Sequence, residues 1–197
     1  DLTQPDPAAE PIILRGHDEH INAVAFSPDN RWLVTASDDS TACLWDLTRA
    51  DPSAKPIVLP GPKGSPIYAV AFSPDGHWLA TGAGLIRGSS ENDIARLWDL
   101  TQPDPAAEPI ILRGHEGVIR AVAFSPDNRW LVTGSDDSTA RLWDLTQPDP
   151  SAEPLVLRGH AKAIGIIAFS PDNHWLVTGS ADNTTRLWNL RPDELIE

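Results

Sequence analysis

Two pairs of adjacent carboxylates come nearest to a catalytic or metal-binding motif in this sequence. Asp38 is followed by Asp39, and Asp136 by Asp137. Neighbouring carboxylates can bind a hard cation or divide acid and base roles. Both pairs, however, lie in an SDDS segment typical of a tight turn. The sequence also has no nucleophile elbow, phosphate-binding loop or CxxC pair. We therefore expect no catalytic residue, no metal and no cofactor.

The composition restricts the classes of partner. The chain has 197 residues, 41% of them hydrophobic, which is enough for a sizeable core. Its formal net charge is −13, and its 15 lysines and arginines are spread along the chain. Because phosphate-rich surfaces attract clustered basic side chains, we expect neither nucleic acid nor a membrane as a partner. A single cysteine, Cys43, fits a reducing compartment, so a cytoplasmic location is expected.

Paired tryptophans reveal an internal repeat. The second member of each pair is Trp45, Trp98, Trp143 or Trp188, and the later three are 45 residues apart. The first interval is longer because unit two carries extra residues, most of them between its two tryptophans. Four units therefore fill almost the whole chain, as in a protein built from one duplicated structural element.

Each unit is predicted to form four β-strands. In unit one these are the apolar or β-branched stretches 11–14, 21–26, 32–37 and 41–45. The segment SPDN or SPDG separates the second and third stretches in every unit, and its residue types favour a tight hairpin. We therefore expect an all-β protein made of short antiparallel strands.

These residues carry a family resemblance. GH (16–17), AFSPD (25–29), LVTASDD (33–39) and LWD (44–46) resemble the tryptophan-aspartate (WD) repeat family of β-propellers. The resemblance implies four-stranded antiparallel blades around a channel, with the first strand of each unit serving as the outermost strand of the preceding blade. The expected ranges are residues 1–190 for a four-blade unit (18–59, 60–112, 113–157, and 158–190 with 10–14) and 191–197 for a truncated C-terminal tail.

The resemblance also implies a structural hydrogen-bond network of histidine, threonine, aspartate and tryptophan in each blade. Unit two departs from it, because Pro62 replaces the histidine and Asn92 the aspartate. We therefore expect blade two to be the least rigid. The residues expected in the three complete networks are His17, Thr35, Asp39, Trp45, His115, Thr133, Asp137, Trp143, His160, Thr178, Asp182 and Trp188.

The opening residues raise the question of how the ring closes. Residues 1–17 recur unchanged at 99–115, where they follow Trp98. Residues 10–14 are therefore expected to be the outer strand of a last blade that otherwise lacks one. We expect this strand to complete the last blade of a second chain, giving an eight-bladed homodimer. The alternative is a closed four-bladed monomer, in which each blade would span about 90°.

The loops after each GH differ most between the units and are the expected protein or peptide-binding face. The resemblance places these loops beside the turn between the third and fourth predicted strands, around the channel entrance. Loops can vary on a rigid scaffold without disturbing it. The candidate residues are Asp18, His20, Asn22, Asp38, Lys63, Tyr68, Leu85, Ile86, Glu116, Arg120, Asp136 and Lys162.

The expected function is a non-catalytic protein–protein interaction scaffold or sensor. The near-identity of the units resembles recently amplified propellers at the C-terminal ends of large bacterial signalling proteins, so a fragment of such a protein is expected. The alternative is a purely structural, self-assembling propeller fragment or an engineered protein with no ligand of its own.

Overall fold

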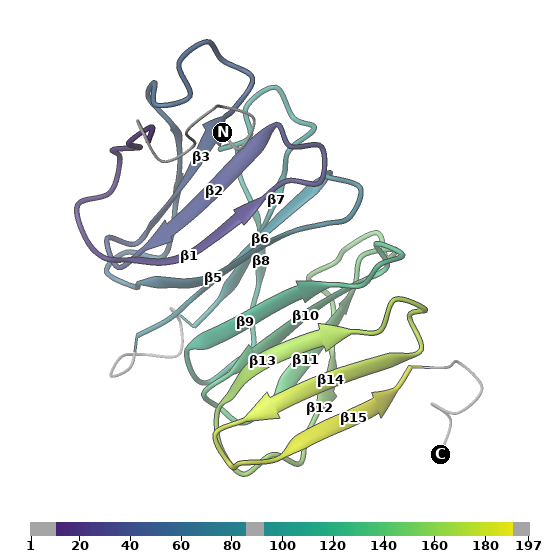
Figure 1. Ribbon diagram of the computed structural model, residues 1–197. Helices are drawn as coiled ribbons and strands as arrows, with labels where there is room; N and C mark the ends of the chain where they lie inside the picture. Colours follow the sequence, from purple (N-terminus) through teal and green to yellow (C-terminus); the bar gives the residue numbers. More distant parts are fainter. Residues whose placement is uncertain (1–10, 86–92, 191–197) are drawn as a thin grey trace.

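The computed structural model describes residues 11–85 and 93–190, and over these residues it contains strands, turns and loops only. No helix among them is long and apolar enough to cross a membrane. The strands form four sheets, which we call blades 1 to 4 (Figure 1). Blade 1 holds β1 (Ile21–Phe26), β2 (Trp32–Ser37), β3 (Thr41–Asp46) and β4 (Ile57–Pro60), and blade 2 holds β5 (Ile67–Phe72), β6 (Trp78–Ala83), β7 (Ala95–Asp99) and β8 (Ile110–Leu112). Blade 3 holds β9 (Ile119–Phe124), β10 (Trp130–Ser135), β11 (Ala140–Asp144) and β12 (Leu155–Leu157), and blade 4 holds β13 (Ile164–Phe169), β14 (Trp175–Ser180) and β15 (Thr185–Asn189).

Every strand pairs antiparallel with the next strand along the chain inside its blade. The SPDN and SPDG segments form the predicted hairpins between the first two strands. Their last residues, Asn30, Gly76, Asn128 and Asn173, have φ values of 59°, 71°, 62° and 61°. Asparagine and glycine tolerate this left-handed conformation, which explains why these two types end the segment.

The outer strands confirm that the opening stretch of a unit completes the blade before it. β4, β8 and β12 follow the proline-rich linkers and pair with β3, β7 and β11. Blade 4 has three strands among the described residues, in the order β13, β14, β15. The all-β blade architecture is therefore as predicted, and the outer edge of β15 has no strand beside it in the described part of the chain.

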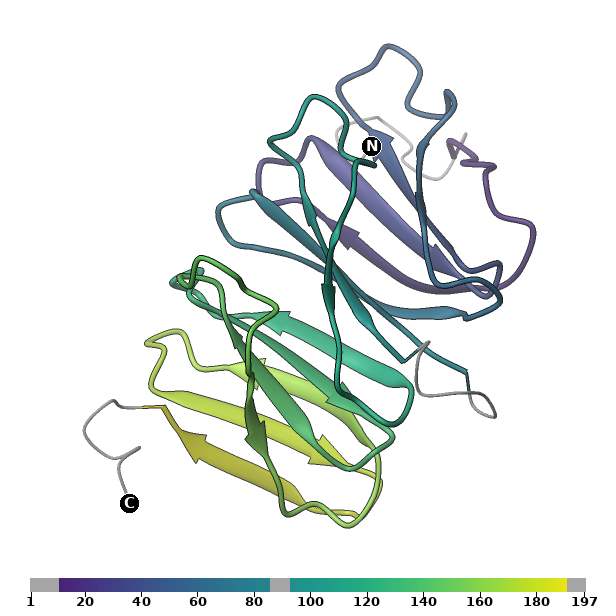
Figure 2. The same cartoon turned by 180° about the vertical axis from the view of Figure 1, so that it is seen from behind.

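The blades stack face to face in an arc, and the inner strands β1, β5, β9 and β13 contact one another in this order (Figures 1 and 2). Each contact buries one apolar face of a blade against the opposite face of the next. Between blades 1 and 2, for example, Val34 and Leu44 form one core cluster with Ile67, Leu79 and Trp98. Burial of such side chains is the main stabilising contribution to the fold.

The arc is open, which corrects the alternative of a closed four-bladed monomer. Blades 1 and 4 lie at its two ends, and the contacts between inner strands run from β1 to β5, β9 and β13 without returning to β1 (Figure 2). Residues 11–14 form no strand in the single chain, and Ile12 and Ile13 are exposed. In the single chain this segment therefore belongs to no blade, and its pairing with β15 of a second chain stays a prediction. Residue 10 and the tail 191–197 lie outside the described residues.

Candidate interaction face

The loop after GH and the turn between the second and third strands of a blade lie side by side in all four blades. The backbone N–H of Asp38 donates to the carbonyl of His20 at 2.9 Å, and that of Asp136 donates to Val118 at 2.9 Å. The corresponding bonds are Gly84 to Pro66 at 3.3 Å and Ala181 to Ala163 at 2.9 Å. The interaction face consists of the loops 18–20, 63–66, 116–118 and 161–163, the described residues of these turns and the first residues of the inner strands.

In blade 3 a chain of four side chains runs from the sheet to this face. The indole N–H of Trp143 donates to Thr133 Oγ1 at 3.1 Å, and His115 Nε2 lies 2.8 Å from the same oxygen. His115 Nδ1 lies 2.7 Å from Asp137 Oδ2. Because an indole can only donate and a carboxylate can only accept, the threonine hydroxyl donates to Nε2 and the Nδ1–H donates to Asp137. One tautomer of a neutral histidine satisfies the whole chain.

Blades 1 and 4 contain the same arrangement. In blade 1 the histidine-to-aspartate, histidine-to-threonine and tryptophan-to-threonine distances are 2.9, 2.8 and 3.1 Å. In blade 4 the same distances are 2.9, 2.9 and 3.0 Å. The structure thus brings together the twelve side chains expected for the network: His17, Thr35, Asp39 and Trp45 in blade 1, His115, Thr133, Asp137 and Trp143 in blade 3, and His160, Thr178, Asp182 and Trp188 in blade 4.

The aspartate of each network also fixes the backbone of the interaction face. Asp137 accepts hydrogen bonds from the backbone N–H groups of Glu116 at 3.0 Å and Thr139 at 2.8 Å, and from the Thr139 hydroxyl at 2.7 Å. Burial alone would raise the pKa of Asp137, but the hydrogen bonds from His115, Thr139 and Glu116 outweigh it and hold that pKa well below its usual range. We call the histidine–aspartate half of the network the clamp, since it ties the loop to the turn.

Blade 2 lacks the clamp. Trp98 Nε1 donates to Thr81 Oγ1 at 3.2 Å, so the sheet half of the network is present. Pro62 is buried in the place of the histidine, and Asn92 lies outside the described residues. The next residue, Asp93, is only 4% exposed, and its Oδ1 accepts a hydrogen bond from Leu85 N–H at 3.1 Å. Burial raises the pKa of Asp93, and the nearby charge of Asp136 adds to the shift.

Asp93 is a site residue that the sequence reasoning missed. Alignment of unit two with the other units places the turn aspartate at position 92, where Asn92 stands, and not at the acid that follows it. The only signal available was the presence of an acid at the end of a polar insertion, immediately before a strand.

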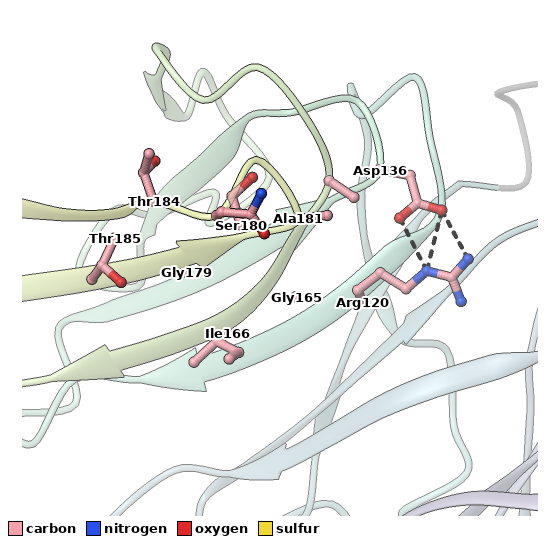
Figure 3. Close-up of a pocket in the computed structure, with 11 residues that line it drawn as sticks. Arg120, Asp136, Gly165, Ile166, Gly179, Ser180, Ala181, Thr184 and Thr185 are labelled. Carbon is pink, nitrogen blue, oxygen red and sulfur yellow. Dashed lines mark hydrogen bonds and ion pairs between the residues drawn. The ribbon is translucent and has the colours of Figure 1, made fainter.

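Two of the candidate binding residues form ion or hydrogen-bond pairs with the turn of their own blade. Asn22 Nδ2 donates to Asp38 Oδ1 at 2.7 Å. Arg120 donates through Nε and Nη2 to Asp136 at 3.1 and 2.8 Å (Figure 3). The hydrogen bonds that Arg120 donates to Asp136 raise the pKa of Arg120 above its usual value. The first aspartate of each SDDS pair therefore binds the inner strand, while the second belongs to the clamp.

The same two candidates also reach the neighbouring blade. Asn22 Nδ2 donates to the carbonyl of Ile67 in blade 2 at 3.1 Å. The Arg120 guanidinium of blade 3 stacks over the ring of Tyr68 in blade 2, 4.5 Å from its centroid, a favourable cation–π contact. These side chains join blades 1, 2 and 3 at the interaction face, so they contribute to its rigidity as well as to its surface.

The other candidates differ in exposure. Leu85 is half-buried, and Ile86 lies outside the described residues. His20 contacts Asn22, with its Nδ1 at 3.2 Å from the amide oxygen. The exposed candidates on the interaction face are Asp18, His20, Asp38, Lys63, Glu116 and Lys162.

The described residues contain no group of three or more histidine, cysteine, aspartate or glutamate side chains that could hold a metal ion. The Cys43 thiol is buried, and its burial raises the pKa to about 11. It occupies the place of Arg141 and Arg186, whose guanidinium groups donate to the carbonyls of Gly114 and Gly159. The arrangement can therefore position loops and present polar side chains, and it places no activated nucleophile in the described part of the face.

Comparison with known proteins gives matches to several proteins that are much longer than this chain. A segment of 44 residues is 43% identical to the target of rapamycin complex subunit LST8 of Saccharomyces cerevisiae, covering 22% of this chain and 14% of that protein. The guanine nucleotide-binding protein subunit beta of Oryza sativa subsp. japonica is 30% identical over 126 residues, 64% of this chain and 31% of that protein. The ribosome biogenesis protein bop1 of Danio rerio is 44% identical over 36 residues, 18% of this chain and 5% of that protein. The chain therefore spans less than a third of the length of each of these relatives.

The family described as WD domain, G-beta repeat matches four segments, residues 10–46, 55–99, 108–144 and 153–189. These segments cover most of the sequence, and each includes the first three strands of one blade. The chain belongs to the WD domain, G-beta repeat family and is a four-repeat β-propeller protein.

Proposed function

We propose that this protein is a non-catalytic scaffold that binds a protein or peptide partner through the interaction face. The observation that carries the proposal is the clamp, which fixes the backbone beneath exposed side chains that differ from blade to blade. A rigid base lowers the entropy that a loop loses on binding, so it favours affinity without a change of shape. Two of the relatives are named as subunits, one of them of a complex, which supports an interaction role.

The exposed side chains of the face offer recognition by charge. Acidic side chains project from the loops of blades 1 and 3, as at Asp18 and Glu116, and basic ones from blades 2 and 4, at Lys63 and Lys162. A partner that crosses several loops therefore meets alternating charge, which contributes more to specificity and orientation than to raw affinity.

Selection of displayed peptides tests this role. Peptides enriched from a random library on the wild-type protein are expected to bind a Lys63→Glu/Lys162→Glu variant at least tenfold more weakly. They should bind an Ala152→Asp variant normally, because Ala152 is exposed in the outer loop of blade 3. Equal binding of the selected peptides to all three proteins would contradict the proposal.

We also propose a second copy of the chain as a partner, with two arcs forming an eight-bladed ring. Residues 11–14 of one copy would pair with the open edge of β15 in the other. The sequence PIIL at 11–14 also stands at 109–112, where Ile110–Leu112 forms β8 beside β7. The same residues therefore form an outer strand in blade 2, which supports the proposal that they can do so beside β15, and an unpaired edge favours such pairing.

The mass of the particle in solution tests this strand exchange. Light scattering should give about twice the 21.4 kDa of one chain. An Ile12→Pro/Ile13→Pro variant should give the mass of a single chain, because proline cannot donate to a strand ladder. An Ile12→Val/Ile13→Val variant should keep the wild-type mass. A wild-type mass of 21.4 kDa at micromolar concentration would contradict the ring.

The setting that we propose is the cytoplasm of a bacterial cell, as a sensor or scaffold within a larger signalling protein. The near-identity of the four units and the greater length of the relatives are compatible with it. The relatives named above are eukaryotic, so the bacterial setting depends on the sequence resemblance alone. A purely structural, self-assembling role predicts instead that the selected peptides do not distinguish the interaction face.

A further inference from the structure

The first blade exposes side chains that the other blades bury. Ile21, at the start of β1, is 47% exposed, whereas its counterparts Ile67, Ile119 and Ile164 are 1%, 0% and 0% exposed. Each counterpart packs against the preceding blade. We call the side of blade 1 that carries Ile21, Val24 and Phe26 its free face, and all three residues are exposed.

The last blade shows the converse. Leu187 of β15 is 60% exposed, whereas its counterparts Leu44, Leu97 and Leu142 are at most 1% exposed. These counterparts lie on the side of each blade that the next blade covers. Ile166 in β13 is exposed on the same side of blade 4. We call this side the free face of blade 4.

The two free faces correspond to the two sides of the contact between neighbouring blades. The chain makes this contact three times, between blades 1 and 2, 2 and 3, and 3 and 4. A Cβ on Gly82 of blade 2 would lie 2.6 Å from Ile119 Cγ2 and 3.3 Å from Val122 Cγ1 of blade 3. A Cβ on Gly134 of blade 3 would lie 2.9 Å from both Ile164 Cγ2 and Ile167 Cδ1 of blade 4. Glycine therefore leaves room for the isoleucine and the second apolar side chain of the next inner strand.

At the counterpart Gly179 the space is not filled by another blade. The three nearest atoms to a Cβ there all belong to Ile166 of the same blade, at 3.2 Å or more. A hollow of about 620 Å³ opens beside it, lined by Gly165, Ile166 and Gly179 and bordered by Arg120 and Asp136 of blade 3 (Figure 3). The side chains that fill this place at the internal contacts correspond to Ile21 and Val24 of blade 1.

A hydrogen bond between the hairpins of neighbouring blades also repeats along the arc. Asn128 of blade 3 accepts a hydrogen bond from the backbone N–H of Asp75 in blade 2 at 3.0 Å. Asn173 of blade 4 accepts one from Asp127 of blade 3 at 3.2 Å. The next pair in the series is Asp172 of blade 4 with Asn30, which lies in the hairpin of blade 1 and is exposed.

We propose that the free face of blade 4 binds the free face of blade 1 of a second copy, with Ile21 and Val24 of that copy seated over Gly179. This deepens the self-association proposed above, because it names the surface that holds the two arcs together. The contact between faces rests on the proposed function for the number of copies, which is two. It does not require that residues 11–14 pair with β15. Two copies each supply one face of each kind, so two identical contacts close the ring.

A disulfide trap tests this contact. At the contact between blades 2 and 3, a Cβ on Gly82 would lie 3.3 Å from Ile119 Cβ, close to the separation of about 3.5–4.5 Å in a disulfide. An Ile21→Cys/Gly179→Cys variant should therefore oxidise to a covalent dimer on a denaturing gel. Cys43 is buried with a raised pKa and should not compete.

Each other outcome of the trap overturns the proposal. An intramolecular disulfide, seen as a monomer that migrates faster before reduction, would show that blades 1 and 4 of one chain meet. A ladder of higher multimers would show an open filament, and a free monomer would show no contact. The single variants Ile21→Cys and Gly179→Cys should each remain uncrosslinked, and their mixture should give a dimer with one disulfide.

A charged variant separates this contact from the strand exchange. Val24→Asp should reduce the particle to the 21.4 kDa of one chain, while Ala152→Asp should leave the dimer intact. If the Ile12→Pro/Ile13→Pro variant stays dimeric and Val24→Asp does not, the contact between faces holds and strand exchange is wrong. A Val24→Asp variant that stays dimeric would overturn the contact and leave strand exchange as the sole link.

Discussion

Blades 2 and 3 form almost the same sheet with different hydrogen-bond networks. Both have four antiparallel strands, and Trp98 and Trp143 are each 1% exposed. Both indole N–H groups donate to a threonine in the second strand of the blade. Blade 3 adds the clamp, and blade 2 does not. The second and third strands therefore pair with or without the clamp, through the same backbone ladder and the same threonine–tryptophan hydrogen bond.

The clamp instead decides how firmly the interaction face is attached to its sheet. In blade 3 the loop and turn are tied by Asp137, and Ser135 Oγ donates to the carbonyl of Gly117 at 2.7 Å. In blade 2, Ser65 Oγ is buried with no hydrogen-bond partner among residues 11–85 and 93–190. Loops with fewer satisfied polar groups need less free energy to unfold locally. The comparison thus separates residues that form a blade from residues that fix its loops.

Removal of the threonine hydroxyl should give the largest effect and distinguish the two blades. Thr133→Val leaves two buried nitrogen atoms without a partner, Trp143 Nε1 and His115 Nε2, and should lower the free energy of unfolding by about 3 kcal/mol. Thr81→Val removes only the partner of Trp98 and should cost about 1.5 kcal/mol. Urea denaturation of both variants measures the difference. Equal losses would contradict the additional role of the clamp.

The carboxylates of the two blades should respond to pH in opposite directions. The folded-state pKa of Asp137 is lowered, so its contribution to stability is present above the unfolded pKa of about 3.9 and is lost as the pH falls through the folded value. Asp137→Asn should therefore be less stable than the wild type by about 1–2 kcal/mol at pH 7, with a gap that narrows below about pH 4.

Asp93 of blade 2 supplies the matched control for this pH dependence. Its folded-state pKa is raised, so the charged form is penalised above the unfolded pKa and the penalty disappears at low pH. Asp93→Asn should be at least as stable as the wild type at pH 7, and any gain should shrink as the pH falls. Urea denaturation from pH 3 to pH 7 checks both variants, and parallel curves for the two would contradict the assignment.

Sequence reasoning reached the blades because their residues act locally. The SPDN and SPDG hairpins need a residue with positive φ at their last position, as at Asn30 and Gly76. Asparagine and glycine tolerate this φ in any protein, so the residue type alone predicts the hairpin. The sequence pattern places the strand at the start of each unit in the preceding blade, and β4 pairs with β3 as expected. The twelve network residues could be aligned because the spacing inside three of the units is constant.

Contacts between blades were harder to predict because they join residues from different units. The stack of Arg120 on Tyr68 requires the angle between two sheets, which no spacing within a unit contains. Asp93 follows an insertion, where alignment of the units fails. The arc is open because each blade packs only on its neighbours, from β1 to β5, β9 and β13. The angle between neighbouring blades is not contained in the strand pattern, so the strands alone do not exclude a closed four-bladed ring.

Two serine-to-alanine substitutions provide the finest test of the comparison. Ser135→Ala removes a hydroxyl that donates to Gly117 and accepts from Asp137 N–H at 3.1 Å, and it should lower the free energy of unfolding by about 1 kcal/mol. Ser65→Ala removes a buried hydroxyl that has no partner in the described part of the chain, and it should be neutral or stabilising by up to about 1 kcal/mol. Thermal and urea denaturation measure both changes. A clear loss of stability for Ser65→Ala would mean that blade 2 satisfies its loop through Ser65, in which case the difference between the two blades would be one of partners rather than of rigidity.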